Sequence, residues 1–149
     1  MKIIEMRPPK IAMALLASAF ALHWLLPIWE GLRFSFPFTG TAIGTLGFAT
    51  MMWGWWLFQQ HKVAICPTAQ TDKLVFDGPY RFTRNPMYLG MVSIFLGVAI
   101  LMGTLPFFLA AATYFVILNS VFIPFEEQKL AATFGADYLE YKRRVRRWL

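Results

Sequence analysis

The sequence predicts an all-α fold, an integral membrane bundle of about four transmembrane helices in a single domain spanning residues 1–149. Hydrophobic residues make up 58% of the chain and charged residues 15%, whereas average soluble domains have about a quarter charged residues. The charges are confined to short segments between long apolar stretches. This composition excludes a disordered chain, which needs low hydrophobicity, and argues against an ordinary soluble enzyme.

The first two apolar stretches each predict one transmembrane helix. Residues 11–29 form the first span, and His23 is its only titratable side chain. We interpret it as a retained span because it exceeds the 7–15 apolar residues of a typical signal peptide. Residues 36–58 form the second span and contain no charged side chain.

The third apolar stretch predicts two spans joined by a tight turn. Residues 87–125 contain no Asp, Glu, Lys, Arg or His, and the stretch is about twice the length needed for one crossing of a bilayer. Gly103 to Pro106 carries turn-forming residues near its middle. We therefore expect spans at residues 87–102 and 105–123.

Four spans place every lysine and arginine except Arg33 on one side of the membrane. Basic residues mark the cytoplasmic side, so both termini are predicted to be cytoplasmic, with the protein in the plasma or inner membrane if its source is bacterial. This distribution accounts for the net charge of +6 without nucleic acid as a partner. The only cysteine, Cys66, excludes an internal disulfide and a cysteine-based metal cluster.

The cytoplasmic segment 72–90 predicts an anion-binding site. Asn85 and Pro86 form a typical helix start, with Asn as the cap and Pro in the first turn. The free backbone N–H groups there carry partial positive charge, and Arg81 and Arg84 add two full charges. The bland alternative is that these arginines only orient the protein in the membrane.

The cytoplasmic segment 124–149 begins with two adjacent acids, Glu126 and Glu127. They can pair with the arginines of segment 72–90 or with a cationic ligand, although they also fit an ordinary first helical turn. Further along, aromatic and apolar residues recur at helical spacing among basic residues: Tyr138, Tyr141, Val145 and Trp148. This pattern predicts two short helices broken at Gly135, the second lying on anionic membrane lipid.

The sequence motifs of these segments resemble those of the isoprenylcysteine carboxyl methyltransferases, which are grouped with the phospholipid methyltransferases of membranes. The resemblance covers about residues 72–145. It rests on these motifs: Gly78-Pro79-Tyr80-Arg81, Arg84-Asn85-Pro86-Met87-Tyr88-Leu89-Gly90, Glu126-Glu127, Phe134-Gly135, Tyr138 and Tyr141. It implies a membrane methyltransferase that binds S-adenosylmethionine (SAM) at the cytoplasmic end of the last two helices, closed in by the C-terminal segment.

By position, the resemblance assigns the following residues to the cofactor: Lys73, Leu74, Val75, Tyr80, Arg81, Arg84, Asn85, Pro86, Met87, Tyr88 and Glu126. It assigns catalytic roles to Arg84, which suits the SAM carboxylate, and to Glu127, the nearby base that an amine acceptor would require. An ionised carboxylate acceptor needs no strong base, so catalysis would rest on alignment in a water-poor site. No metal and no nucleophilic residue are expected.

Two departures from the family wording bear on the acceptor. Asn85 stands where the family has His and cannot titrate. Residues 119–124 contain no arginine, although the eukaryotic prenylcysteine enzymes bind the substrate carboxylate with arginine there. The default acceptor is a prenylated, isoprenylcysteine-like carboxylate, and the alternative is the amine of a phosphatidylethanolamine-type phospholipid. A non-catalytic small membrane protein on the same scaffold is the rival interpretation.

Overall fold

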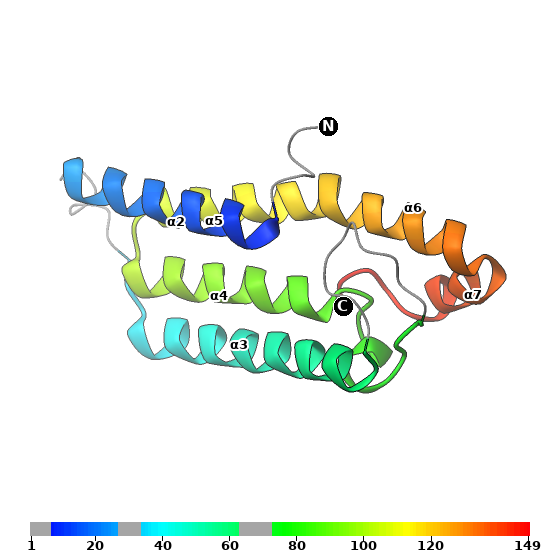
Figure 1. Ribbon diagram of the computed structural model, residues 1–149. Coiled ribbons are helices and arrows are strands. Elements are labelled where there is room, and N and C mark those ends of the chain that lie inside the picture. The colour runs from blue at the N-terminus through cyan, green and yellow to red at the C-terminus, as the bar shows by residue number, and fades with distance from the viewer. Residues whose placement is uncertain (1–6, 27–33, 63–72) are drawn as a thin grey trace.

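The computed structural model describes residues 7–26, 34–62 and 73–149 (Figure 1). These residues form helices and no β-strand, as the all-α prediction requires. The helices are α2 (Pro8–Leu25), α3 (Pro37–Gln60), η2 (Gly78–Arg81), α4 (Pro86–Met102), α5 (Leu105–Ile117), η3 (Leu118–Phe122), α6 (Ile123–Phe134) and α7 (Ala136–Arg144). The η2 element is a 3₁₀ helix and η3 is a π-helical turn.

The long helices lie side by side in the order α3, α4, α5 and α2 (Figure 1). Helices α5, η3 and α6 follow one another without a break and form one rod, from which α7 folds back. The chain reverses direction between successive long helices. As a result, the end of α3, the start of α4 and the α6–α7 corner gather at one end of the bundle.

The turn between α4 and α5 confirms the predicted break within the third apolar stretch, between residues 102 and 105. Gly103 ends α4 in the left-handed conformation, with a φ of 66°, and its N–H donates to the Ala99 carbonyl at 2.8 Å. A Cβ at this position would lie 2.5 Å from the Phe34 carbonyl carbon. The turn therefore needs glycine both for its conformation and for its close packing.

Helices α3 and α4 approach each other through glycines. A Cβ on Gly97 would lie 2.6 Å from the Gly40 carbonyl oxygen, and one on Gly90 would lie 2.5 Å from that of Gly47. Small residues allow helix backbones to pack this closely, and membrane helices commonly associate in this way. The lengths of the hydrophobic runs do not predict this interface, because they do not show which face of a helix is in contact.

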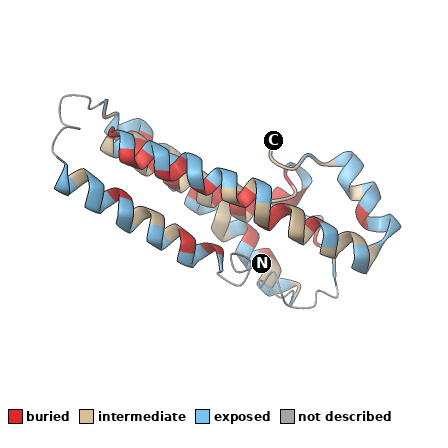
Figure 2. Ribbon diagram, turned by 90° about the horizontal axis from the view of Figure 1, so that it is seen from above, coloured by how far each residue is buried: buried red, intermediate tan, exposed pale blue. Residues whose placement is uncertain are grey.

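Exposed residues follow the outer faces of the bundle (Figure 2), and many of them are large and apolar. Phe38 is 91% exposed and Trp24 is 78% exposed, which is unusual for a protein surrounded by water. The rod Leu105–Phe134 is long and apolar enough to cross a membrane, and Pro86–Met102 is a shorter apolar helix. Four crossings and cytoplasmic termini stay predictions, and part of the first predicted span, with Arg33 beyond it, lies outside the described residues.

The predicted C-terminal amphipathic helix is wrong beyond Arg144. The break at Gly135 is present, but α7 ends at Arg144 and Val145 is extended, with φ −118° and ψ 133°. Trp148 instead stacks near Phe115, with ring centroids 5.1 Å apart. Trp148 stands at helical spacing from Tyr141 and Val145, but in the fold it packs against the hydrophobic core instead of continuing the helix. A role of the basic tail on anionic lipid stays a prediction.

Candidate active site

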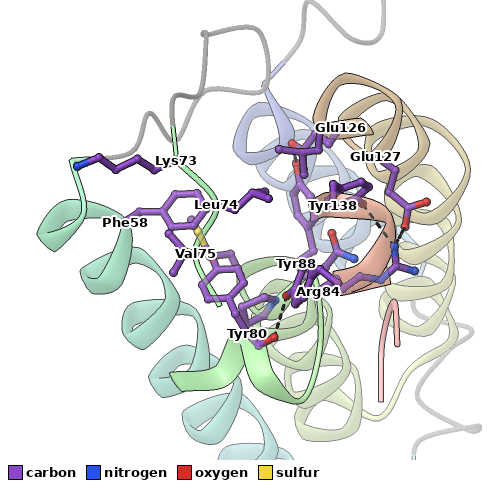
Figure 3. A pocket seen from close by; sticks show the side chains of 15 residues that line it. Phe58, Lys73, Leu74, Val75, Tyr80, Arg84, Tyr88, Glu126, Glu127 and Tyr138 are labelled. Carbon is purple, nitrogen blue, oxygen red and sulfur yellow. Dashed lines mark hydrogen bonds and ion pairs between the residues drawn. The ribbon is translucent and has the colours of Figure 1, made fainter. Parts of the chain in front are cut away.

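A pocket lies at the end of the bundle where α3, α4, α6 and α7 meet the segment before η2 (Figure 3). It is lined by Phe58, Lys73, Leu74, Val75, Tyr80, Arg84, Asn85, Pro86, Met87, Tyr88, Glu126, Glu127, Leu130, Tyr138 and Tyr141. The fold therefore brings together all residues predicted for the cofactor and for catalysis, with the exception of Arg81. In Figure 3, Phe58, Val75 and Tyr80 lie across the pocket from Glu126 and Arg84.

Glu127 is held by three cations. Its Oε1 lies 2.9 Å from Arg84 Nη1, and its Oε2 accepts from Lys142 Nζ at 3.2 Å. Arg147 donates to both oxygens, at 3.1 and 3.0 Å. Burial alone would raise the pKa of Glu127, but the hydrogen bonds from Arg147 and the charge of Arg84 lower it overall. Glu127 is thus an ionised anchor with little capacity to accept a further proton.

Arg84 is nearly buried beside this anchor. Its side chain is 9% exposed, and its Nη1 also donates to the Tyr138 hydroxyl at 3.4 Å. The Nε of Arg84 is buried and has no hydrogen-bond partner in the described part of the protein. A buried donor without an acceptor is costly, so this atom fits an anionic ligand group in the pocket.

Glu126 has the opposite environment from its neighbour. It follows the apolar part of the rod and lies outside the predicted span of residues 105–123. Its Oε1 accepts a hydrogen bond from the Tyr88 hydroxyl at 2.5 Å. Burial raises its pKa to about 7, although the Tyr88 hydrogen bond and the charge of Lys129 act in the other direction. Glu126 is therefore the pocket carboxyl that can exchange a proton near neutral pH.

Aromatic rings form the opposite wall. Phe58 stacks on Tyr80 with ring centroids 5.4 Å apart and an angle of 10° between planes. The Tyr141 hydroxyl donates to the Tyr80 carbonyl oxygen at 2.7 Å, which ties α7 to η2. Burial raises the pKa of both tyrosines, so they remain neutral. Such rings can stack on a planar base or face a cation.

The helix start at Asn85 and Pro86 is present, but Asn85 does not cap it. Its side chain makes no capping bond, because Nδ2 donates instead to the Arg147 carbonyl oxygen at 3.0 Å. The Asn85 side-chain amide therefore binds the C-terminal tail, and the predicted side-chain cap is wrong. The first turn of α4 keeps free N–H groups at the pocket edge.

Arg81 lies away from this pocket. It is 71% exposed and pairs with Asp77 at 3.3 Å, so η2 turns it toward the surface. Among the described residues, no cluster of three or more His, Cys, Asp or Glu side chains could hold a metal ion. Cys66 lies outside the described residues.

Several residues of the site were not predicted as such. Tyr138 and Tyr141 were named only as part of the family motif and of an apolar helix face. No sequence pattern pointed to Phe58 or Leu130. Lys142 and Arg147 stood in a basic run that suggested lipid contact. Only the fold shows that two of these cations turn inward to Glu127.

Comparison with known proteins agrees with the resemblance. A sequence model of the phospholipid methyltransferase family matches residues 36–137, which is more than half of the chain. The chain belongs to the phospholipid methyltransferase family. This assignment confirms the methyltransferase class, and the matched region includes the pocket residues from all segments up to the start of α7.

Among curated relatives of this phospholipid methyltransferase family member are two enzymes of Bradyrhizobium diazoefficiens. Methanethiol S-methyltransferase 1 is 33% identical over 66 residues, covering 44% of this chain and 22% of that protein. Methanethiol S-methyltransferase 2 is 39% identical over 67 residues, covering 44% of this chain and 24% of that protein. The match thus spans less than a quarter of the length of either enzyme.

An uncharacterised protein of Haemophilus influenzae is 35% identical over 63 residues, which is 42% of this chain and all of that protein. No solved structure matches the chain.

Proposed function

We propose that this protein is a SAM-dependent methyltransferase of the membrane that acts on a small lipophilic acceptor. The observation that carries the proposal is the buried Nε of Arg84, which has no partner among the described residues, in a pocket that also contains Glu126 and an aromatic wall. Membership of the family supports the reaction type.

The pocket residues fit the chemical groups of SAM. Arg84 and the first turn of α4 suit its carboxylate, and Glu126 suits its ammonium group or ribose hydroxyls. The stacked rings of Phe58 and Tyr80 suit the adenine base. When bound, SAM supplies a methyl group made electrophilic by its sulfonium. The protein's part is to hold the acceptor in line and to exclude water.

The two acids support a choice among acceptors. Glu126 titrates near neutral pH and can take a proton from a thiol or an amine, whereas Glu127 is held ionised by its three cations. A carboxylate acceptor would lie beside Glu126, and of the described residues that line the pocket Lys73 is the only cation besides Arg84. We therefore place a thiol first, which the names of the relatives also favour, a phospholipid amine second, and a prenylcysteine carboxylate third.

Calorimetric titration of the detergent-purified protein with SAM tests the proposal. We expect binding, strong loss of affinity in Arg84→Ala and Glu126→Ala, and no change in Arg143→Ala, an exposed arginine of α7. Incubation with methyl-labelled SAM then compares methanethiol, phosphatidylethanolamine vesicles and a prenylcysteine analogue. Absence of SAM binding at millimolar concentration would overturn the enzyme assignment, and binding without label transfer to any acceptor would support the non-catalytic rival.

A further inference from the structure

Residues 145–149, which follow α7, return to the start of α4 and contact Thr83, Arg84 and Asn85 beside the pocket. We infer that Arg147 is a positioning residue: it fixes Glu127, and through Glu127 it aligns Arg84 for the carboxylate of the cofactor. This inference rests on the proposed function and adds to it a residue that touches neither the cofactor nor the acceptor.

The tail, residues 145–149, is first bonded to Thr83 and Arg84, which precede α4. The Arg84 N–H donates to the Arg146 carbonyl oxygen at 2.9 Å, and the Thr83 hydroxyl donates to the Arg147 carbonyl oxygen at 3.0 Å. Thr83 is 2% exposed, and its hydroxyl oxygen also accepts from the Asn85 N–H at 3.2 Å. These bonds fix the backbone of Arg84 relative to that of Arg147.

The guanidinium of Arg147 then connects the tail to the rod, where it binds both Glu127 and Asn119. Its Nε and Nη2 donate to the two oxygens of Glu127, which is the planar two-bond geometry that arginine forms and lysine cannot. Its Nη1 donates to the Asn119 side-chain oxygen at 3.2 Å. Asn119 lies in the π-helical turn η3, and the same oxygen accepts from Trp148 Nε1 at 3.1 Å.

Glu127 finally links Arg147 to Arg84, because both arginines contact its carboxylate. Arg147 Nε and Arg84 Nη1 share the same oxygen, Glu127 Oε1, at 3.1 and 2.9 Å. With its Nη1 occupied by Glu127 and Tyr138, Arg84 has its Nε left for a ligand. Without Arg147, the Glu127 carboxylate would keep Arg84 and Lys142 but lose the two-bond contact that fixes its plane, and the orientation of the Arg84 side chain would be less well defined.

The test compares two ligands in calorimetric titrations of the full-length, detergent-purified protein. S-adenosylhomocysteine carries the amino-acid group, whereas 5′-methylthioadenosine has the same nucleoside without it. We expect Arg147→Gln to weaken S-adenosylhomocysteine binding about tenfold or more, as for a misplaced charge-assisted hydrogen bond, and to leave 5′-methylthioadenosine binding unchanged. Arg147→Lys should recover part of the loss, because it restores the charge without the two-bond geometry. Arg143→Gln, a charge-matched change, should bind both ligands as the unmodified protein does.

The outcomes separate the inference from the proposed function. Equal S-adenosylhomocysteine binding by Arg147→Gln and the unmodified protein would overturn the positioning role alone. A parallel loss of both ligands would also overturn it, since Arg147 would then support the fold as a whole. Failure of the unmodified protein to bind either ligand would overturn the proposed function and this inference with it.

Discussion

Replacement of Glu126 by glutamine gives a direct test of the pocket electrostatics. Burial raises the pKa of Glu126 from an ordinary 4.5 to about 7, which corresponds to a cost of about 3 kcal/mol for the ionised form. A cationic ligand group beside Glu126 stabilises that ionised form, so binding should release a proton when the pH is below 7. We therefore expect affinity for S-adenosylhomocysteine to rise as the pH increases toward 7 and then to level off.

Calorimetry from about pH 5.5 to about pH 8.5 in buffers of different ionisation enthalpy measures both the affinity and the released protons. The isosteric Glu126→Gln variant removes the titrating group, while the ligand's own amino group titrates equally with both proteins. The ratio of the two affinities therefore isolates Glu126. Parallel pH curves for the two proteins, with equal proton release, would refute the assigned environment of this carboxyl.

The same shift predicts a pH dependence of stability. The folded-state pKa of Glu126 is above the unfolded-state value, so its contribution to stability is complete below about pH 4.5 and is lost as the pH rises through about 7. The glutamine variant has no such loss. Its thermal unfolding temperature in detergent should therefore rise relative to that of the unmodified protein across this range, and a constant difference would contradict the prediction.

Three further predictions test the fold and the site. Gly97→Leu should lower the free energy of unfolding by about 1–3 kcal/mol or prevent assembly, because its Cβ would lie 2.6 Å from the Gly40 oxygen. Gly44→Ala should be tolerated in the same melting assay, because the nearest atom to its Cβ would lie 4.0 Å away. Arg84→Lys should weaken SAM binding about tenfold because lysine lacks the planar fork, while Arg81→Lys, outside the pocket, should not; equal titration curves would contradict this. Reporter fusions at the two termini should both give a cytoplasmic signal, and opposite signals would exclude the four-span topology.

Much of the backbone could be predicted from the order of apolar runs and turn residues. Gly103 ends one helix and Pro86 begins another because positive φ and the missing N–H act locally. Pairing of the Glu126-Glu127 segment with the arginines of segment 72–90 was one of two alternatives that the sequence left open, since four antiparallel helices bring both segments to one side. The 2.9 Å contact between Arg84 and Glu127 confirms that alternative.

Local pattern could not predict the tail. Trp148 stands at helical spacing from Tyr141 and Val145, yet residues 145–149 are not helical. The carbonyl oxygens of Arg146 and Arg147 instead accept from Arg84 and Thr83, which are more than sixty residues away. The same contact draws the Asn85 amide away from its capping position. Interactions between such distant segments depend on how the helices pack, which no local spacing encodes.

The sequence by itself determined the helical class and the segments at the polar end, which follow from composition and from short-range chemistry. Its resemblance to a known family, rather than local chemistry, pointed to most of the side chains that line the pocket. The tertiary structure alone decided that Glu127 is saturated by three cations while Glu126 titrates near neutral pH. The two acids are adjacent and chemically identical, so only burial and the partners supplied by α4, α7 and the returning tail give them different roles.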